Sequence, residues 1–401
     1  MAEHRRSEPA RLLVLGAGPA QLGLLEAAAA RGVYVIAVDG DPLAVGFGLA
    51  DERALVSSED EGGIERLARA REVDGVISPG ADWPVGIAAR VAERLGLPHP
   101  IDAVTAVLAT TKTRQRERLG ATGVAQPKTF SSSDADIPVP CVVKAPDRQG
   151  QRGLTLVRDR DELAAAIEVA VAESRGGSAL VEELIDGPEV TVNAVSVDGN
   201  FIPLTVTDRL TAEPPAFGVA LAHVWPSEVD EPAVIEVARA AAAALGVRNG
   251  PTYTQIRVGA DGPKVVELAA RLGGGHDAEL CRAAVGVDLN DLAVSFALGV
   301  PSTASGSEPQ ALSSVGGACV LFLVAPVGVL RATEGVVAAE AVEGVEWVRT
   351  YRSPGWSFGL LRRGADRAGA ILATGADREE ALARARRAAE AVRFLVDAPP
   401  A

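Results

Sequence analysis

The sequence predicts an α/β fold that opens with a parallel sheet and continues into α+β units. Residues 11–40 read as strand, glycine turn, helix and strand, and both strands are continuous apolar runs. Such runs are typical of parallel strands covered by helices on both faces. The alternation of helix and strand recurs from residue 63, and the pattern changes near residue 104. We therefore expect an N-terminal, open parallel-sheet α/β domain over residues 1–104.

The glycine turn runs from Gly16 to Gly23 and opens a helix, where backbone amides and the helix dipole can hold an anion. Its glycine spacing departs from the dinucleotide fingerprint, although Asp39, at the end of the second strand, could meet a ribose hydroxyl. We interpret the segment as a tight turn that binds no dinucleotide. A nicotinamide-dependent oxidoreductase is the alternative function that this turn and Asp39 leave open.

Residues 105–301 are expected to form a second domain, of the α+β type. A helix over residues 105–123 is followed by strands and hairpins, and Asp198-Gly199 is a strong hairpin signal. Two further helices, at residues 161–174 and 230–246, interleave with these strands. Alternation of this kind indicates an α+β unit.

Residues 302–401 are expected to form a small C-terminal α+β domain. A stretch of linker composition, residues 302–310, begins it, and short strands and a last amphipathic helix over residues 377–394 follow. The uncharged run from Pro309 to Leu330 is interrupted by glycine and proline. We therefore expect a buried strand with flanking turns there, and not a membrane span.

The composition excludes several classes of protein. A hydrophobic content of 48% and a charged content of 23% are those of a chain with a sizeable core. The net charge of -14 disfavours binding to a nucleic-acid backbone. The three cysteines, Cys141, Cys281 and Cys319, are widely spaced, so we interpret them as core residues of a reducing compartment and not as disulfide or zinc ligands. The start of the chain lacks a signal-peptide pattern, which favours a cytoplasmic protein.

The pieces that carry chemistry lie between Lys112 and Glu279. Lys112 stands in the helix that enters the second domain, and Lys144 ends the strand CVVK. A loop with Gly150 and Gly153 follows, then the segment VEELIDGPEV and the strands YTQIRV and VVELAARLGGGH. In this order the pieces resemble the ATP-grasp superfamily. The resemblance implies a central domain whose two lobes clasp ATP, and a C-terminal domain shaped like a lid.

A triphosphate site needs the groups that these pieces offer. Two lysines on separate elements supply compact cations, and the glycine-bearing loop can fold over the phosphates and exclude water. The resemblance implies that backbone groups of Glu182, Glu183 and Leu184 read the adenine edge. It also implies that Glu189 accepts hydrogen bonds from the ribose hydroxyls.

Gln255 and Glu267 form the expected magnesium site. They lie on two short strands joined by the turn GADGP, so a hairpin places them roughly opposite one another. Mg²⁺ takes oxygen ligands, usually one or two protein carboxylates together with the nucleotide's phosphates. Many family members carry an acid in place of Gln255 and an asparagine in place of Ala269. A nucleotide-binding protein without turnover is therefore a second alternative.

Arg271 follows Glu267 by four residues and precedes the glycine run LGGGH. A tetrahedral acyl-phosphate intermediate would need such a cation beside free backbone amides. His276 is a candidate to orient substrate or to carry a proton near neutral pH. Amino-acid ligases of the superfamily show a similar stretch. The resemblance thus implies an ATP- and Mg²⁺-dependent ligase that activates the carboxylate of an amino acid and joins it to an amine.

The N-terminal residues GPAQLG and DGDP resemble the front domain of the purine-pathway carboxylases of the same superfamily. The expected partners are a small-molecule carboxylate and an amine, without nucleic acid or membrane, and a homodimer is left open. Arg209, His223 and Trp225 lie between the lobes in sequence. We interpret these three as ordinary loop residues and not as the lining of an acceptor pocket.

Overall fold

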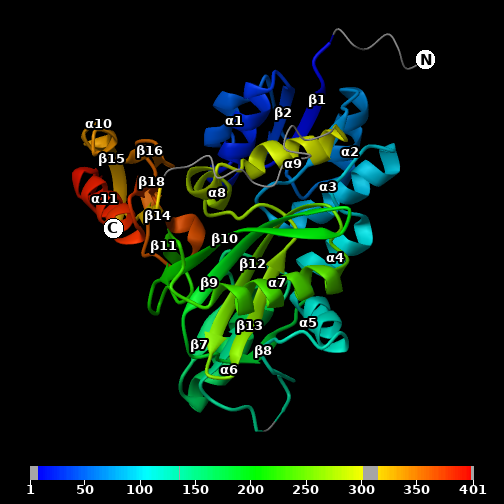
Figure 1. The fold of residues 1–401 in the computed structure, drawn as a ribbon, viewed down its shortest axis with the longest axis vertical. Coiled ribbons are helices and arrows are strands. Elements are labelled where there is room, and N and C mark those ends of the chain that lie inside the picture. Colours follow the sequence, from blue (N-terminus) through cyan, green and yellow to red (C-terminus); the bar gives the residue numbers. More distant parts are fainter. Residues whose placement is uncertain (1–7, 135, 301–314, 399–401) are drawn as a thin grey trace.

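The computed structural model describes residues 8–134, 136–300 and 315–398. Residues 302–310, expected to be a linker, lie outside this description. Figure 1 shows a helix-covered N-terminal unit at one end, a small lobe at the other, and a C-terminal unit beside the middle of the molecule.

The N-terminal unit is an open parallel sheet, as predicted, with the strand order β3-β2-β1-β4. Helices α2 and α3 cover one face, and α1 covers the other together with α9, which comes from the end of the middle region. Alternate residues of β1 enter the two cores, which is why this strand is apolar throughout. The bounds are β1 Arg11–Leu15, β2 Tyr34–Asp39, β3 Glu52–Leu55, β4 Gly75–Ile77, α1 Leu22–Ala30, α2 Glu61–Ala70, α3 Asp82–Leu95 and α9 Leu289–Leu298.

The glycine turn after β1 is closed by its own side chains. The Asp39 carboxylate accepts hydrogen bonds from the backbone amides of Ala17, at 2.8 Å, and Asp41, at 2.9 Å. Gln21 is buried and folds back over Gly16, where an added Cβ would lie 3.0 Å from the Gln21 side chain. Gln21 therefore fills space that a dinucleotide phosphate would need. The geometry supports a tight structural turn and weakens the oxidoreductase alternative.

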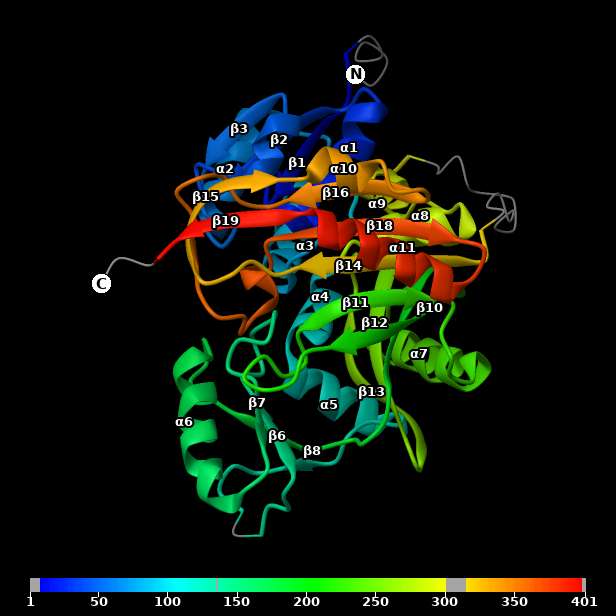
Figure 2. The ribbon, with the colours of Figure 1, turned by 90° about the vertical axis from the view of Figure 1, so that its left-hand side faces the viewer.

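An antiparallel sheet of eight strands forms the centre of the molecule, in the order β13-β12-β9-β10-β11-β14-β18-β16. The predicted hairpin at Asp198-Gly199 is confirmed, and both of its residues have positive φ. The last three strands of the sheet come from the C-terminal region, because β14 pairs with β11. Figure 2 shows the two sets of strands side by side. The bounds are β9 Glu189–Val197, β10 Asn200–Thr211, β11 Ala220–Trp225, β12 Gly250–Gly259, β13 Gly262–Ala269, β14 Gly317–Leu323, β16 Val345–Thr350 and β18 Gly369–Gly375.

The small lobe is a four-stranded antiparallel sheet, β5-β8-β6-β7, with helix α6 packed on it. It lies at the lower end of the molecule in Figure 2. Its core includes Cys141, and all three cysteines of the chain are free and buried, as expected. The bounds are β5 Thr129–Phe130, β6 Cys141–Lys144, β7 Thr155–Val157, β8 Leu180–Glu183 and α6 Leu163–Glu173.

The helix expected over residues 105–123 is broken into α4 (Ala103–Thr110) and α5 (Lys112–Ala121). Thr111 between them has an extended backbone, with φ -121° and ψ 108°. The break puts Lys112 at the first turn of α5, where its backbone amide donates to Pro146 O at 2.9 Å. Two further helices, α7 (Glu231–Leu245) and α8 (Asp277–Val285), pack against the central sheet.

The C-terminal region adds a second layer beside the shared sheet. A three-stranded sheet, β17-β15-β19, lies next to helices α10 and α11, and α11 confirms the predicted last helix. None of the helices in the described part of the chain is long and apolar enough to cross a membrane. The division into three domains at residues 104 and 301 remains a prediction. The bounds are β15 Gly328–Glu334, β17 Ser357–Phe358, β19 Arg393–Asp397, α10 Val336–Glu340 and α11 Arg378–Ala391.

Candidate functional site

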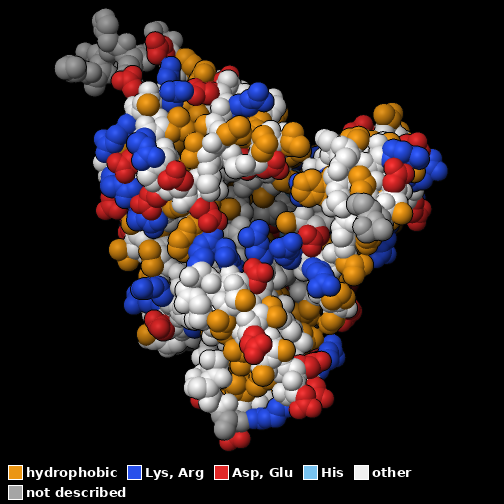
Figure 3. Space-filling view, turned by 180° about the vertical axis from the view of Figure 1, so that it is seen from behind, with side chains coloured by type: hydrophobic (Ala, Val, Ile, Leu, Met, Phe, Trp, Pro, Cys, Tyr) orange, Lys and Arg blue, Asp and Glu red, His pale blue; other side chains and the backbone are white. Residues whose placement is uncertain are grey.

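A cleft separates the small lobe from the central sheet. Its lining comes from both sides and includes nine of the residues expected above to bind nucleotide or metal: Lys112, Lys144, Gly150, Glu182, Glu183, Leu184, Glu189, Gln255 and Glu267. In the space-filling view of Figure 3, Lys and Arg side chains gather around a hollow across the middle of the molecule. Apart from Gly153, which packs against Ala145 and Glu173 and is not among the lining residues, the residues expected to bind the nucleotide therefore converge, although they lie far apart in sequence.

The two lysines are buried and each is held by a carboxylate. Lys112 Nζ lies 2.8 Å from Glu267 Oε1 and donates to Arg148 O at 2.7 Å. Lys144 Nζ lies 2.6 Å from Glu182 Oε2. Burial lowers the pKa of Lys144, and nearby Arg116 and Lys112 lower it further, against the opposing effect of Glu182. The cleft thus concentrates positive charge where added negative charge would be stabilised.

Glu182 has a side-chain role that sequence reasoning did not assign. Its second oxygen, Oε1, lies 2.6 Å from Arg116 Nε, so one carboxylate joins α5 to two strands of the small lobe. Burial by itself would raise the pKa of Glu182, but Lys144 and Arg116 outweigh it and lower that pKa. Glu183 points elsewhere, to Lys264 Nζ at 2.8 Å. Leu184 follows the end of β8 and lines the cleft.

Glu189 lies in the cleft, as expected, but its carboxylate forms ion pairs with two arginines. Arg209 Nε is 2.7 Å from Oε1, and Arg257 Nε is 3.1 Å from Oε2. All three side chains come from the central sheet, on β9, β10 and β12. A ribose hydroxyl would share these oxygens with the guanidinium groups.

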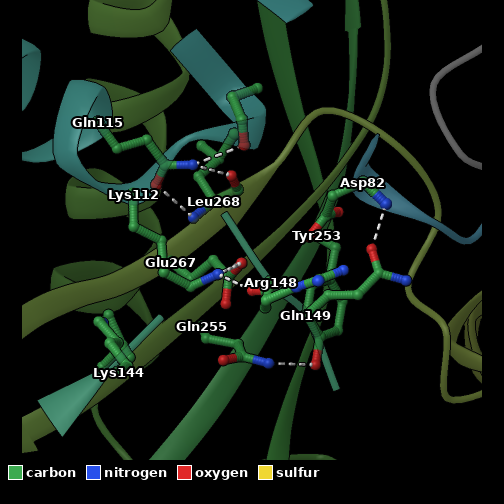
Figure 4. Close-up of polar contacts among 12 residues, drawn as sticks. Asp82, Lys112, Gln115, Lys144, Arg148, Gln149, Tyr253, Gln255, Glu267 and Leu268 are labelled. Atoms are coloured by element: carbon green, nitrogen blue, oxygen red, sulfur yellow. Dashed lines mark hydrogen bonds and ion pairs between the residues drawn. The ribbon is translucent and has the colours of Figure 1, made fainter. Parts of the chain in front are cut away.

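Gln255 and Glu267 are direct neighbours across β12 and β13, which confirms the predicted register. Glu267 faces Lys112, and burial, which would raise the pKa of Glu267, is outweighed by Lys112, so this pKa is lowered. Gln255 Nε2 donates to Tyr253 Oη at 2.9 Å. No residue in the described ranges donates to the Gln255 amide oxygen. Figure 4 shows Lys112, Gln255 and Glu267 around one space, with Lys144 nearby.

Ala269 stands at the position where the resemblance led us to expect an asparagine, and its side chain offers no ligand atom. Ala269 is buried at the end of β13 and pairs with Tyr253. No cluster of three or more His, Cys, Asp or Glu side chains suited to a metal occurs within residues 8–134, 136–300 and 315–398. One carboxylate and one amide oxygen fit Mg²⁺ only if phosphate oxygens and waters complete its coordination, which is the usual arrangement at nucleotide sites.

Gln115, which the sequence did not single out, fixes the start of α5 against β13. Its amide nitrogen donates to Ala109 O and to Leu268 O, each at 2.7 Å, and its amide oxygen accepts from Leu268 N at 3.1 Å. Figure 4 shows these bonds beside Lys112. Because Leu268 follows Glu267, these bonds fix the strand next to that carboxylate.

The loop after Lys144 has the conformation that its glycines allow. Gly150 and Gly153 have φ of 66° and 65°, in the left-handed region that glycine enters without strain. Gln149 reaches across the cleft and accepts a hydrogen bond from the backbone amide of Asp82, the first residue of α3. The loop therefore bridges the small lobe and the N-terminal unit.

Arg271 is fixed at the border of the cleft. Its Nε lies 2.6 Å from Asp82 Oδ1, and its Nη1 donates to Leu272 O at 2.6 Å. Burial would lower the pKa of Arg271, but Asp82 and Glu267 outweigh it and raise that pKa. The guanidinium therefore stays charged and oriented.

His276 is not brought into the cleft. It is buried in a left-handed backbone conformation, φ 61°, which turns its ring toward the C-terminal region. Its Nε2 lies 2.6 Å from Tyr351 Oη, and its Nδ1 lies 3.1 Å from Glu279 Oε1. The expectation that His276 itself meets substrate is therefore not supported by its position. Its hydrogen-bond partner Tyr351 lines a second cavity.

A second cavity, of about 410 Å³, adjoins the cleft and shares Gln255 and the loop residues 148–152 with it. Arg209 and His223 line it, which corrects our interpretation of both as loop residues: they face each other on β10 and β11. Trp225 ends β11 and packs into the C-terminal core, so it too is not a loop residue. A histidine within the apolar run ALAHVW was the available sequence signal, since a buried polar group needs a partner.

His223 is paired with a buried acid behind the cavity wall. Its Nδ1 lies 3.0 Å from Asp277 Oδ1. Burial lowers the pKa of His223 despite the opposing effect of Asp277. Asp277, the first residue of α8, was not found from the sequence.

Two protein families match parts of the chain: the ATP-grasp domain over residues 137–279, and the L-amino acid ligase C-terminal domain 2 over residues 321–397. Carnosine synthase 1 of Gallus gallus is 28% identical over 376 residues, which cover 84% of this chain but 39% of that longer protein. A formate-dependent phosphoribosylglycinamide formyltransferase of Burkholderia vietnamiensis is 29% identical over 408 residues and covers 96% of this chain and 95% of its own. Among solved structures, an L-amino acid ligase from Bacillus licheniformis superposes with a TM-score of 0.83 at 21% identity, over 97% of this chain and 99% of that one. This last likeness shows a shared fold.

The ion pairs of Glu182 predict a large loss of stability when this carboxylate is removed. Glu182→Ala leaves Lys144 and Arg116 as buried cations without their acid, and should lower the free energy of unfolding by about 3–5 kcal/mol. Glu183→Ala breaks the ion pair with Lys264, which is more exposed, and should lower the free energy of unfolding by only about 0–1 kcal/mol. Urea denaturation of both variants measures the difference. Equal stabilities would show that the buried pairs do not matter.

A second prediction concerns the pH dependence of stability. Burial would raise the pKa of Glu279, but His276 and Arg349 outweigh it and lower this pKa from 4.5 to about 2. A carboxyl with a lowered folded pKa stabilises the fold above its unfolded pKa and loses that contribution as the pH falls toward about 2. The shift corresponds to about 3 kcal/mol.

Glu279→Gln should therefore lower the free energy of unfolding at neutral pH and flatten its decline between about pH 4.5 and pH 2. Glu236→Gln, whose side chain is 73% exposed, is the matched control and should leave the profile unchanged. Chemical denaturation over a pH series measures both. A profile for Glu279→Gln parallel to that of the parent would contradict the lowered pKa.

Proposed function

We propose that this chain, which carries an ATP-grasp domain followed by an L-amino acid ligase C-terminal domain, is an ATP- and Mg²⁺-dependent carboxylate-amine ligase. The observation that carries the proposal is the convergence of two buried lysines, a glutamine and a glutamate in one cleft. That cleft opens at Gln255 into a second cavity that can hold the molecules to be joined.

ATP fits the polarity of the cleft from one end to the other. The segment from Glu182 to Ile185 supplies backbone groups and an apolar side chain for the base, and Glu189 lies where a ribose hydroxyl can donate to it. Lys144 and Lys112 would hold the phosphates, and the loop around Gly150 would cover them. A phosphate beside Lys144 would offset the burial that lowers the pKa of its ammonium group.

Glu267 and the amide oxygen of Gln255 would hold Mg²⁺. The metal, when bound, would neutralise charge on the phosphate oxygens. Lys112 now neutralises Glu267, at 2.8 Å, so this lysine would turn from the carboxylate toward the phosphates as the metal arrives. Ala269 supplies no ligand, which leaves more of the coordination to phosphate and water oxygens.

The proposed reaction takes place where the nucleotide cleft meets the second cavity. A carboxylate oxygen of the first substrate attacks the γ-phosphorus of ATP, the bond to the β-phosphate oxygen breaks, and ADP leaves. The neutral amine of the second substrate then attacks the acyl carbon, phosphate departs, and the nitrogen releases one proton to the phosphate or to water, which gives an amide. Arg271 is oriented by Asp82 and Leu272 to stabilise the oxyanion of this tetrahedral step.

An amino acid is the best-supported class of substrate. The C-terminal family match, the likeness to carnosine synthase 1 and a 23% identity to the alanine-anticapsin ligase of Bacillus subtilis all support it. The second cavity, about 410 Å³, has the size of a small-molecule site. A binding protein without turnover is the remaining alternative, because of Ala269.

We propose in addition that the protein acts in the cytoplasm, where its three free cysteines stay reduced, and that its partners are small molecules. We also propose a homodimer, which the structure of a single chain does not test. Sedimentation velocity would measure the assembly state.

The proposed function predicts ADP release that depends on Mg²⁺ and on an amino acid, with a condensed product detectable by mass spectrometry. Arg271→Ala should lower kcat by about 100- to 1,000-fold, because it removes the positioned oxyanion donor. Glu267→Ala should act at least as strongly and raise the Mg²⁺ concentration needed. Arg387→Ala, an exposed change on α11, is the control and should match the parent.

Two results would contradict the proposal. ATP binding without ADP release over the whole amino-acid panel would favour a binding protein. Full activity of both Glu267→Ala and Arg271→Ala would show that the site is assigned to the wrong residues.

A further inference from the structure

Gln255 differs from an acid in having only one oxygen to offer a metal. A carboxylate presents two equivalent oxygens, so either can face the ion, whereas an amide turned by half a rotation presents its NH2 group instead. Glu267, directly across from Gln255 on β13, is the carboxylate of the proposed metal site. The orientation of the Gln255 amide therefore decides whether this pair offers oxygen from both side chains or from Glu267 alone.

The Gln255 amide is held on its nitrogen side by Tyr253. The two side chains lie on the same face of β12, because they stand at alternate positions of one strand. Gln255 Nε2 donates to Tyr253 Oη at 2.9 Å. Figure 4 shows the amide oxygen of Gln255 on the side away from Tyr253. The nitrogen is thus tied to the phenol, and the oxygen points elsewhere.

Tyr253 is itself fixed from two sides. Arg209 Nη1 donates to its phenol oxygen, and Arg209 Nε lies 2.7 Å from Glu189 Oε1, which orients the guanidinium. The phenol ring packs against the glycine run, where a Cβ added to Gly273 would lie 2.6 Å from Tyr253 Cδ2. Tyr253 is buried as a result. Its oxygen is therefore a preset acceptor for the amide of Gln255.

The neighbouring carboxylate is the competing partner for the amide nitrogen. An ionised carboxylate only accepts hydrogen bonds, so an amide turned toward Glu267 would give it an N–H and withhold its oxygen from a cation. Tyr253 supplies the nitrogen with another acceptor, and Lys112 Nζ lies 2.8 Å from Glu267 Oε1. The amide oxygen is in this way left for the cleft, which Gln255 lines.

We propose that Tyr253 is a positioning residue of the metal site, which keeps the NH2 group of Gln255 turned away so that the amide oxygen can bind Mg²⁺. The inference rests on the proposed function, which places Mg²⁺ at Gln255 and Glu267. A chain of hydrogen bonds then runs from Glu189, the proposed ribose acceptor, through Arg209 and Tyr253 to the metal ligand. This chain gives an amide the fixed orientation that a carboxylate would not need.

The test measures metal affinity directly, with Mn²⁺ as the probe because it takes the same oxygen ligands as Mg²⁺. Free Mn²⁺ is followed by electron paramagnetic resonance in the presence of saturating ADP, so that no turnover is required. Tyr253→Phe should weaken Mn²⁺ binding about 10-fold, at the low end of what the loss of a hydrogen bond to a metal ligand costs. Tyr34→Phe, on β2 and outside the lining of both cavities, is the matched control and should bind Mn²⁺ like the parent.

A second background separates orientation of the amide from a general structural role. In Gln255→Glu the two oxygens are equivalent, so adding Tyr253→Phe there should change the Mn²⁺ affinity by less than about threefold. Calorimetric binding of ADP without metal should stay within about twofold of the parent in Tyr253→Phe. An unchanged Mn²⁺ affinity in Tyr253→Phe would overturn the inference. So would equal losses in the two backgrounds, or an equal loss of ADP affinity without metal.

A failure of the proposed function gives a different result. If the parent binds Mn²⁺ with ADP but releases no ADP from ATP with any amino acid, the ligase reaction falls, and the Mn²⁺ affinities still decide the role of Tyr253. If the parent binds no Mn²⁺ in the presence of ADP, the metal site itself is wrong and the inference falls with it.

Discussion

The neutralisation of buried cations by two carboxylates is the constraint on which the site depends. Lys112 and Lys144 are the proposed phosphate ligands and Arg116 is buried behind them, and the fold must hold these three cations together before any nucleotide arrives. Glu182 and Glu267 make this possible, at contact distances of 2.6 to 2.8 Å. Burying each of these cations without such a partner would cost several kcal/mol. The cleft is thus an ion-pair network in which an acid can exchange partners when phosphate and metal enter.

Much of the fold could be predicted because its signals are local. Apolar runs, the hairpin at Asp198-Gly199 and the facing positions of Gln255 and Glu267 follow from periodicity and turn chemistry, which act over a few residues. The break at Thr111 was missed because a single extended residue between two helices leaves the helical pattern almost intact. The three-domain division could not reveal that β14 joins β11, since that pairing depends on contacts a hundred residues apart.

The site was predicted less completely than the fold, for a physical reason. Residues with a family signature were found, whereas residues that act through a partner were not. The arginines on Glu189, the Asp277 carboxylate behind His223 and the Gln115 amide at β13 are recognisable only once the chain is folded. His276 shows the reverse error. It was a candidate to orient substrate or to carry a proton, but a left-handed turn directs its ring to Tyr351 and away from the cleft.

Asp82 explains how three parts of the chain can act on one reaction. It begins α3 of the N-terminal unit, its amide holds Gln149 of the small-lobe loop, and its carboxylate holds Arg271 of the central region. The loop proposed to cover the nucleotide is therefore fastened to the same residue that orients Arg271, the proposed oxyanion donor. Since Arg271 is fixed by Leu272 O as well, its charge is in place before the reaction and need not be recruited during it. In the proposed function the covering loop and the oxyanion donor thus share one anchor, Asp82, which lies outside the ATP-grasp match at residues 137–279.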